Sequence, residues 1–251
     1  DHGRHMAELP LHPRLAHMLI RAISLRLADQ ACEVAALLSE RDVLHGPAAG
    51  QNVDVRVRLD VLQGEGDCSS QAVNRIALER VRRTAQLWRR QLKRLSGKPN
   101  GDGHDHPHVA GLLLALAYPD RIAQRQPGEI ASYRLVNGRG ARFRRPDPIA
   151  TEPFLVIADL DGGGQWADIN LAAPITCEAI ESLYQEQVIE EELVVWDERI
   201  GAVRASCRRS LGSVILSEVA LSKPDEQSLV HALLQGIGKV GIHILNIPPE
   251  L

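Results

Sequence analysis

The sequence predicts an α+β fold, in which an N-terminal all-α helical bundle is followed by a small antiparallel OB-like β-barrel and a C-terminal helical segment. Three observations support this prediction. Apolar residues recur every three or four positions from about residue 14 to residue 95, which is the period of an amphipathic helix. From Ser132 onward, short β-branched and aromatic runs alternate with glycine-rich turns, and helical spacing returns after residues 222–225.

This pattern divides the 251 residues into three parts. Residues 1–104 are predicted to form the helical bundle and a linker. Residues 105–222 are predicted to hold a connecting helix and the barrel, and residues 223–251 a terminal helical segment. The first boundary rests on a stretch rich in Gly, Asp, His and Pro at 96–108, a composition typical of linkers.

The helical part is predicted to contain several consecutive helices. Glycine and proline residues lie between the apolar stripes, where they end helical structure. A short helix is expected over residues 53–63, and the longest over residues 70–95. A further helix should start at Pro107, since proline fits the first helical position, and stop at Pro119.

The second part is predicted to contain several short strands and one helix. Asn137 and Gly138 mark a tight turn, because Asn-Gly readily adopts positive φ angles. The strands are expected at 133–136, 141–144, 154–160, 166–171, 188–196, 202–208 and 214–221. A helix capped by Thr176 is expected at 177–184. We expect all of these strands to form one small barrel, of which the OB-fold is a type that binds nucleic acid.

The net charge of -3 hides two basic regions and one acidic region. Residues 54–98 contain eleven Lys or Arg against five Asp or Glu, and residues 121–145 contain seven against one. Residues 178–198 contain eight acidic residues and no basic one. Because a polyanion responds to the local field of a patch, the total charge does not exclude nucleic-acid binding.

The predicted long helix carries a basic stripe beside its apolar one. Arg82, Arg89 and Lys93 form this stripe together with Gln86. Cationic groups spaced by about one helical turn, roughly 5.4 Å, can each meet a phosphate oxygen, which gives affinity without sequence preference. The alternative is a solvated basic face whose charge is balanced by the acidic residues 178–198.

Four arginines of the predicted barrel are further candidates for contacts with nucleic acid. Arg139 lies at the tip of the first hairpin, where flanking glycines allow another backbone to approach. Arg142 follows in the next strand. Arg204 and Arg208 alternate with apolar residues, so their side chains should point outward. The alternative is that all four are ordinary surface and turn arginines.

Aromatic residues make up only 3% of the chain, so we expect binding through the phosphate backbone rather than through stacked bases. Trp88 lies on the apolar stripe of the long helix and is expected in the core. Trp166 and Trp196 fall near strand ends. Core packing is expected for both, with a stacking platform as the alternative.

No catalytic or metal-binding constellation is recognisable in the sequence. The four cysteines are far apart, so they fit neither a zinc knuckle nor a dense disulfide framework. The chain contains no G-x-x-x-x-G-K-[ST] phosphate loop and no Asp-Glu-Ala-His run. We therefore expect no cofactor, no metal and no catalytic activity in these residues. The longest apolar run, at 109–118, is about half of what a membrane span needs, so we expect a cytoplasmic protein without membrane contact.

Several segments resemble the DEAH-box ATP-dependent RNA helicases. Residues 3–16, GRHMAELPLHPRLA, are similar to the signature at which the winged-helix region of these helicases meets the helical ratchet bundle. Residues 117–125, AYPDRIAQR, and 136–142, VNGRGAR, resemble the bacterial HrpB branch of the family. Residues 154–162 and 194–197 fit the same branch, so the resemblance spans essentially the whole chain.

The resemblance implies a helicase-associated ratchet domain followed by an OB-like domain. In this family two RecA-like motor domains precede the region and a further domain follows it, which implies that the chain is an internal or truncated piece. ATP and Mg²⁺ would then be cofactors of the longer protein. The expected partners are single-stranded RNA, gripped by its backbone during translocation, and the motor domains of the same polypeptide. The alternative function is a protein-interaction module that docks a basic partner through residues 178–198.

Overall fold

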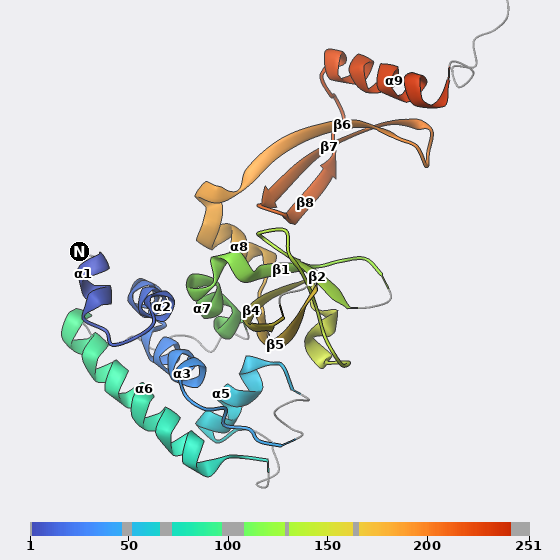
Figure 1. Cartoon of the computed structure of the whole chain (residues 1–251). Coiled ribbons are helices and arrows are strands. Elements are labelled where there is room, and N and C mark those ends of the chain that lie inside the picture. The colour runs from blue at the N-terminus through green and yellow to red at the C-terminus, as the bar shows by residue number, and fades with distance from the viewer. Residues whose placement is uncertain are drawn as a thin grey trace, which may run out of the picture. The chain divides into compact units, whose positions relative to one another are not determined.

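The structure of the protein, a computed structural model, describes residues 2–46, 52–65, 72–96, 108–128, 131–162 and 166–241. The chain forms two compact units that divide after Leu183. The first unit holds the helical part and a closed β-barrel, and the second holds a three-stranded sheet with one helix (Figure 1). The boundary predicted near residue 104 lies outside the described residues.

The helical part of the first unit is built from short and medium helices. They are α1 (His2–Ala7), α2 (Pro13–Ser24), α3 (Ala28–Ser39), α5 (Val55–Gln63), α6 (Arg75–Ser96) and α7 (Val109–Ala117). Asp54 caps α5, because its carboxylate accepts a hydrogen bond from the Arg56 N–H at 2.9 Å, and Gly64 ends the helix with φ +83°. The helices predicted at 53–63 and 70–95 are present, apart from their first residues.

A closed five-stranded barrel follows α7. Its strands are β1 (Ile122–Arg125), β2 (Ser132–Leu135), β3 (Gly140–Arg142), β4 (Phe154–Asp161) and β5 (Trp166–Pro174), in the order β1-β2-β3-β5-β4. β3 and β5 run parallel, and β1 pairs antiparallel with both β2 and β4, which closes the barrel. The turn predicted at Asn137 joins β2 to β3, with Gly138 at φ +85°.

Side chains fill the interior of the barrel. Tyr133 is fully buried, and its hydroxyl donates a hydrogen bond to the Glu152 carbonyl oxygen at 2.8 Å. The ring of Phe143 meets the tyrosine ring edge to face, with the centroids 5.8 Å apart. Burial raises the pKa of Tyr133, so the hydroxyl remains a protonated donor. Leu135 and Ile157 complete this core.

Two features of the β-structure differ from the prediction. The sequence prediction lacks β1, because four residues are too few to show an alternating pattern. The strands predicted at 188–196, 202–208 and 214–221 are present but form a separate sheet. The prediction of one barrel for all strands is therefore wrong. Pairing of β1 with β4 uses the last free edge and leaves no place for a further strand.

α7 is the apolar helix at the centre of the first unit. Ala110, Leu113 and Leu114 are at most 3% exposed, and the helix packs against α2 and α3 as well as against β4 and β5. A Cβ atom at Gly111 would lie 1.9 Å from the Pro174 carbonyl oxygen, so glycine is required for this approach to β5. Neither α7 nor any other helix in the described ranges has the length and apolarity needed to cross a bilayer.

A short extended segment attaches the helices to the barrel. The Val53 carbonyl accepts a hydrogen bond from the Ala172 N–H of β5 at 2.9 Å, and the Val53 N–H donates to the Asp147 carboxylate at 3.0 Å. Arg58 of α5 is only 4% exposed and donates to the Asp42 carboxylate at 2.8 Å. The chain between α3 and α5 is therefore held by partly buried, charge-assisted hydrogen bonds.

The second unit is an antiparallel sheet covered by a helix. Its strands are β6 (Ile189–Asp197), β7 (Ala202–Leu211) and β8 (Val214–Ala220), with β7 in the middle, and α9 (Glu226–Val240) packs on β6 and β7. Asp225 caps α9 by accepting a hydrogen bond from the Ser228 N–H at 2.9 Å, as its place in the predicted helix start suggests. α8 (Cys177–Tyr184) precedes the sheet and is capped by Thr176, as predicted.

We predict opposite effects for two glycines of α9. A Cβ atom at Gly236 would lie 2.2 Å from a ring carbon of Trp196, whereas nothing lies within 4 Å of a Cβ atom at Gly238. Gly236→Ala should lower the free energy of unfolding of the second unit by about 1–3 kcal/mol, because it overpacks the contact between helix and sheet. Gly238→Ala should raise it by about 0.5–1 kcal/mol through helix propensity. Urea denaturation followed by tryptophan fluorescence measures both, and equal effects would contradict this packing.

Candidate nucleic-acid interface

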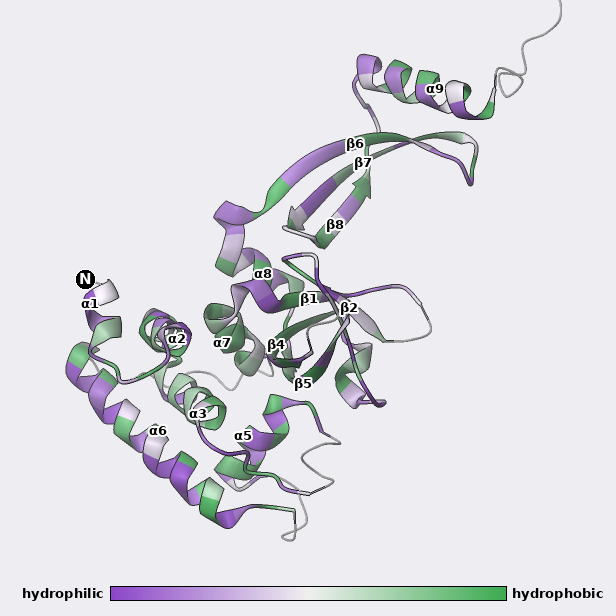
Figure 2. Cartoon of the chain, in the orientation of Figure 1, coloured by the Kyte–Doolittle hydropathy of each residue, from purple (hydrophilic) through white to green (hydrophobic). Residues whose placement is uncertain are grey.

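The apolar stripe of α6 is buried as predicted. Val81, Ala85, Trp88 and Leu92 are at most 5% exposed, and α6 packs mainly against α3. Arg80, Arg83, Arg90 and Arg94 are exposed on the rest of the helix, and Figure 2 shows hydrophilic residues along its length. The burial of this stripe decides which basic side chains of α6 are free to bind a ligand.

Arg82 and Arg89 flank the stripe and bond to neighbouring helices. Arg82 donates two hydrogen bonds to the Leu62 carbonyl oxygen of α5, at 3.0 and 3.3 Å. Arg89 forms an ion pair with Glu33 of α3 and lies 3.5 Å from the Asp29 carboxylate. These two guanidinium groups therefore help to hold α6 in place, and the carboxylates that balance Arg89 belong to α3, not to residues 178–198.

A different set of basic residues forms the outward face of α6. Arg83, Arg90, Lys93 and Arg94 are exposed, and no bond from their side chains to another residue of the described ranges is found. Of the predicted basic stripe, only Lys93 lies here. The helical period could have identified the other three from the sequence. Positions 83, 90 and 94 lie opposite the buried stripe, whereas positions 82 and 89 lie at its sides.

The predicted arginines of the first hairpin lie on the outer surface of the barrel. Arg139, in the turn, donates a hydrogen bond to the Gly162 carbonyl oxygen. Arg142 approaches the Asp168 carboxylate at 3.5 Å, and Arg144 donates to the same carboxylate at 2.7 Å. The hydrogen bond from Arg144 and the nearby charges hold the pKa of Asp168 below its usual range. Arg144 also pairs with the Asp161 carboxylate at 2.8 Å, so the surface carries three arginines and two carboxylates, which leaves a small positive balance.

Arg134 is a further exposed arginine on this surface that the sequence analysis does not select. The register pairs Arg134 with Gly140, and Gly140 with Trp166, so the three residues form one row across β2, β3 and β5. The neighbours Tyr133 and Leu135 are buried, so Arg134 points outward. The alternation of Tyr133, Arg134 and Leu135 is the sequence signal for this position.

The three tryptophans lie in different environments. Trp88 is 5% exposed and belongs to a core as predicted, whereas Trp196 is partly buried and packs against Gly236. Trp166 is 42% exposed on the barrel. The prediction of core packing is wrong for Trp166, because the residue opposite it in β3 is Gly140, which offers backbone rather than a side chain to cover the indole.

Arg204 and Arg208 belong to the second unit and share one carboxylate. Their guanidinium groups lie 3.3 and 3.1 Å from the two oxygens of Glu218 on β8. The Ser206 hydroxyl also donates to Glu218, at 2.9 Å, and with the two arginines it lowers the pKa of that carboxyl. These arginines point outward as predicted, but much of their charge is balanced by this neighbour.

The acidic region is partly balanced inside the second unit as well. Glu190, Glu191 and Glu192 are exposed on β6, which is an edge strand of the sheet. The Glu190 carboxylate lies 3.8 Å from Arg209, and Glu191 pairs in register with Arg208. Charged residues on an edge strand also oppose unwanted pairing with other chains.

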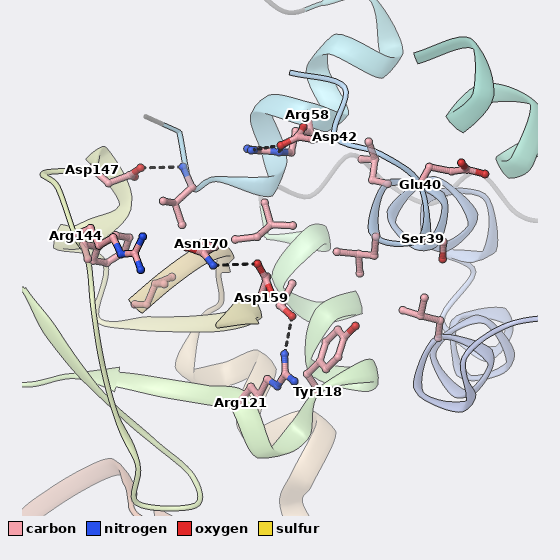
Figure 3. A pocket seen from close by; sticks show the side chains of 18 of the residues that line it. Ser39, Glu40, Asp42, Arg58, Tyr118, Arg121, Arg144, Asp147, Asp159 and Asn170 are labelled. Atoms are coloured by element: carbon pink, nitrogen blue, oxygen red, sulfur yellow. Dashed lines mark hydrogen bonds and ion pairs between the residues drawn. The ribbon is translucent and has the colours of Figure 1, made fainter. Parts of the chain in front are cut away.

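A cleft of about 1140 Å³ lies between the helices and the barrel within the first unit. Figure 3 shows Arg58 and Asp42 on one wall and Arg121 and Asp159 on the other. Arg58 is paired with Asp42, and Arg121 donates to the Ala158 carbonyl oxygen at 2.6 Å. Arginines and carboxylates alternate around the cleft, so it lacks the single-sign charge that binds a polyanion.

The predicted contact residues occupy three surfaces rather than one. Arg82, Arg89 and Lys93 are on α6, Arg139 and Arg142 are on the barrel, and Arg204 and Arg208 are in the second unit. α6 packs on α3, α3 packs on α7, and α7 packs on β4 and β5. α6 also contacts α5, which in turn contacts β5, so other helices lie between α6 and the barrel and their basic residues belong to separate surfaces.

Comparison with known proteins agrees in sequence and in structure. The family model described as "ATP-dependent RNA helicase HrpB, connector region" matches residues 187–221, which include β6, β7 and β8. The ATP-dependent RNA helicase HrpB of Escherichia coli K12 is 30% identical over 250 residues, which cover 99% of this chain and 27% of the relative.

Two crystal structures of Escherichia coli HrpB, described as a DExH-box NTPase and as a DEAH/RHA helicase, match with TM-scores of 0.65 and 0.66 at 26% identity. Each match covers 97% of this chain and 27% of the solved chain, so the present chain spans about a quarter of the length of its relatives. Along almost its whole length, the chain is similar to a part of the ATP-dependent RNA helicase HrpB.

Proposed function

We propose that this chain is a nucleic-acid-binding accessory region of an ATP-dependent RNA helicase, and that it grips the phosphate backbone of single-stranded RNA. The observation that carries the proposal is the group of arginines on the outer face of β2 and β3, in which Arg134 and Arg142 are exposed and Arg139 is partly exposed. Similarity to HrpB supports RNA as the polyanion.

The topology of the barrel supports this location. A closed five-stranded barrel with the order β1-β2-β3-β5-β4 fits an OB-fold. OB-folds bind oligonucleotides on the face of strands 2 and 3, between the loop that joins strands 1 and 2 and the loop that joins strands 4 and 5. Arg134 lies on β2, Arg142 lies on β3, and Arg139 lies in the turn between them. All three therefore belong to this face.

The seven residues predicted as contacts carry different weight in this proposal. Arg142 and Lys93 are exposed and Arg139 is partly exposed, and these three lead the set, although Arg142 lies 3.5 Å from Asp168 and Arg139 donates to the Gly162 carbonyl oxygen. Arg82 and Arg89 already bond to residues of the helical part, and Arg204 and Arg208 are both paired with Glu218. A phosphate that bound any of these arginines would have to compete with a bond already formed, whereas one that bound Lys93 would meet no competing bond from another described residue.

The remaining parts of the proposal concern a longer protein. In that protein, ATP and Mg²⁺ would act in RecA-like motor domains, and the present region would hold the RNA while those domains move along it. The proposed location is the cytoplasm, and the region has no catalytic role of its own. The helical part would act as the ratchet domain that the sequence resemblance implies.

We predict that neighbouring arginines of α6 differ in their contribution to stability. Arg89→Gln should lower the free energy of unfolding by about 1–3 kcal/mol, because it leaves the partly buried carboxylate of Glu33 without its charged partner. Arg90→Gln should change stability by less than about 0.5 kcal/mol, because Arg90 is exposed. Urea denaturation followed by circular dichroism gives both values. A loss of equal size in the two variants would show that Arg89 is not held as described.

We predict that the barrel arginines dominate RNA binding. Fluorescence anisotropy with a labelled single-stranded RNA of about 8 nucleotides measures affinity, which should fall steeply as salt rises from about 50 to 200 mM. The Arg139→Gln, Arg142→Gln double variant should bind more weakly, and its slope of log affinity against log salt should be smaller by about 1.4, or about 0.7 for each lost phosphate contact.

The double variant Arg204→Gln, Arg208→Gln is the matched comparison, because it removes the same charge from the second unit. It should retain most of the affinity, since both arginines lie outside the barrel face and share the Glu218 carboxylate at 3.3 and 3.1 Å. Binding that ignores salt and both double variants would reject the proposed grip.

A second candidate function rests on the exposed glutamates of β6, which could dock a basic protein partner. Glu190→Gln, Glu191→Gln and Glu192→Gln together remove the exposed negative charge of this edge strand. If the acidic region is the functional surface, a purified basic partner should be retained by the chain after nuclease treatment and released by these substitutions. Retention of the partner by the triple variant would eliminate this candidate.

A further inference from the structure

Trp166 presents an aromatic surface to solvent on the same barrel face as the exposed arginines. It is 42% exposed, whereas Trp88 is 5% exposed and Trp196 is covered by α9 at Gly236. Single exposed apolar residues are common on protein surfaces, but proteins that bind single-stranded nucleic acid use exposed aromatic rings to stack bases.

The strand register fixes where the indole lies. β3 and β5 run parallel with Gly140 opposite Trp166, and the next pair in the ladder, Ala141 and Ala167, is fully buried. Because side chains alternate along a strand, Trp166 must face outward. A Cβ atom at Gly140 would come within 2.7–2.8 Å of two carbons of the six-membered ring, so the indole rests directly on the backbone of Gly140.

Arginines occupy neighbouring positions on this face, together with the Asp168 carboxylate. Arg134 follows Gly140 in the same outward row across the sheet. Arg139 directly precedes Gly140 and reaches the Gly162 carbonyl oxygen, in the loop that leads to β5. Arg142 is the next outward residue of β3. An exposed ring with guanidinium groups around it can stack a base and at the same time meet the phosphates on both sides of that nucleotide.

We propose that Trp166 is a stacking platform for one unpaired nucleobase, with Arg134 and Arg139 meeting the adjoining phosphates. This inference rests on the proposed function and adds to it a reason for preferring single strands, because a base inside a duplex has both faces covered by its neighbours. Stacking on an indole tolerates any base, so the platform selects unpaired RNA without reading its sequence.

A structural role is the competing explanation, since an aromatic ring laid over a glycine of a neighbouring strand also stabilises a sheet. Two probes separate the explanations: a single-stranded oligoadenylate of about 8 nucleotides, and a ribose-phosphate oligomer of the same length that lacks bases. The variants are Trp166→Leu, which keeps an apolar cover over Gly140, and Trp166→Tyr, which keeps an aromatic face.

The expected results concern the full chain measured by fluorescence anisotropy. Trp166→Leu should weaken binding of oligoadenylate by about 5-fold or more and leave binding of the abasic oligomer unchanged. Trp166→Tyr should restore most of the affinity. Arg134→Gln should weaken binding of both probes, because phosphates are common to them. Oligoadenylate should also quench tryptophan fluorescence in the native chain, and this quenching should vanish in Trp166→Leu.

Three outcomes decide between the claims. If Trp166→Leu weakens both probes equally, or weakens neither, while the Arg139 and Arg142 substitutions still reduce binding, the stacking inference fails and the phosphate grip stands. If the native chain binds neither probe at about 50 mM salt, the proposed function itself fails. The platform is supported if Trp166→Leu weakens binding of oligoadenylate but not of the abasic oligomer, and if Trp166→Tyr restores the binding of oligoadenylate.

Discussion

The burial of α7 is the constraint on which the first unit depends. The sequence VAGLLLALA has no polar side chain on any face, so the helix can be stable only if it is covered on all sides. α2 and α3 cover one side, and β4 and β5 cover the other. The helical part and the barrel therefore meet in the apolar packing core around α7, which is distinct from the cluster that fills the barrel, and Gly111 allows a close approach between them.

Polar contacts at the edge of this core add specificity to an association that burial drives. Arg14 of α2 forms an ion pair with Asp120, which lies in the short 3-10 helix Pro119–Arg121 before β1. Burial alone would raise the pKa of Asp120, but the hydrogen bond and the charge of Arg14 hold it below its usual range. The Val53 segment adds backbone hydrogen bonds to β5. Such contacts are directional, so they fix which part of the barrel meets the helices.

The same packing decides which arginines remain available to a ligand. An arginine at the side of a buried helical stripe reaches the neighbouring helix and finds a carbonyl or carboxylate there, as Arg82 and Arg89 do. An arginine on the far side of the helix points away from these neighbours, as does Arg90, which is exposed and bonds to no other residue that the structure describes. A count of basic residues therefore overestimates the charge that a polyanion meets, and the position of each residue relative to the apolar stripe is the better guide.

Local patterns predicted most elements, whereas contacts distant in sequence were not predictable. The caps at Thr176 and Asp225 and the turn at Asn137 depend on neighbours within a few residues, and the structure has all three. Barrel closure depends on pairing of β1 with β4, about thirty residues apart, and β1 itself is too short to carry a pattern. The separate sheet of the second unit follows from that closure.

The exposure of Trp166 has the same non-local origin, and this explains why the barrel face differs from its prediction. A tryptophan near a strand end is ordinarily covered by a side chain of the next strand. Here the parallel pairing of β3 with β5 places a glycine opposite it, and Arg134 beyond that glycine. None of these three residues is distinctive alone. Their alignment across β2, β3 and β5 exists only once the barrel is closed, and it turns a surface rich in arginine into one that can also contact a base.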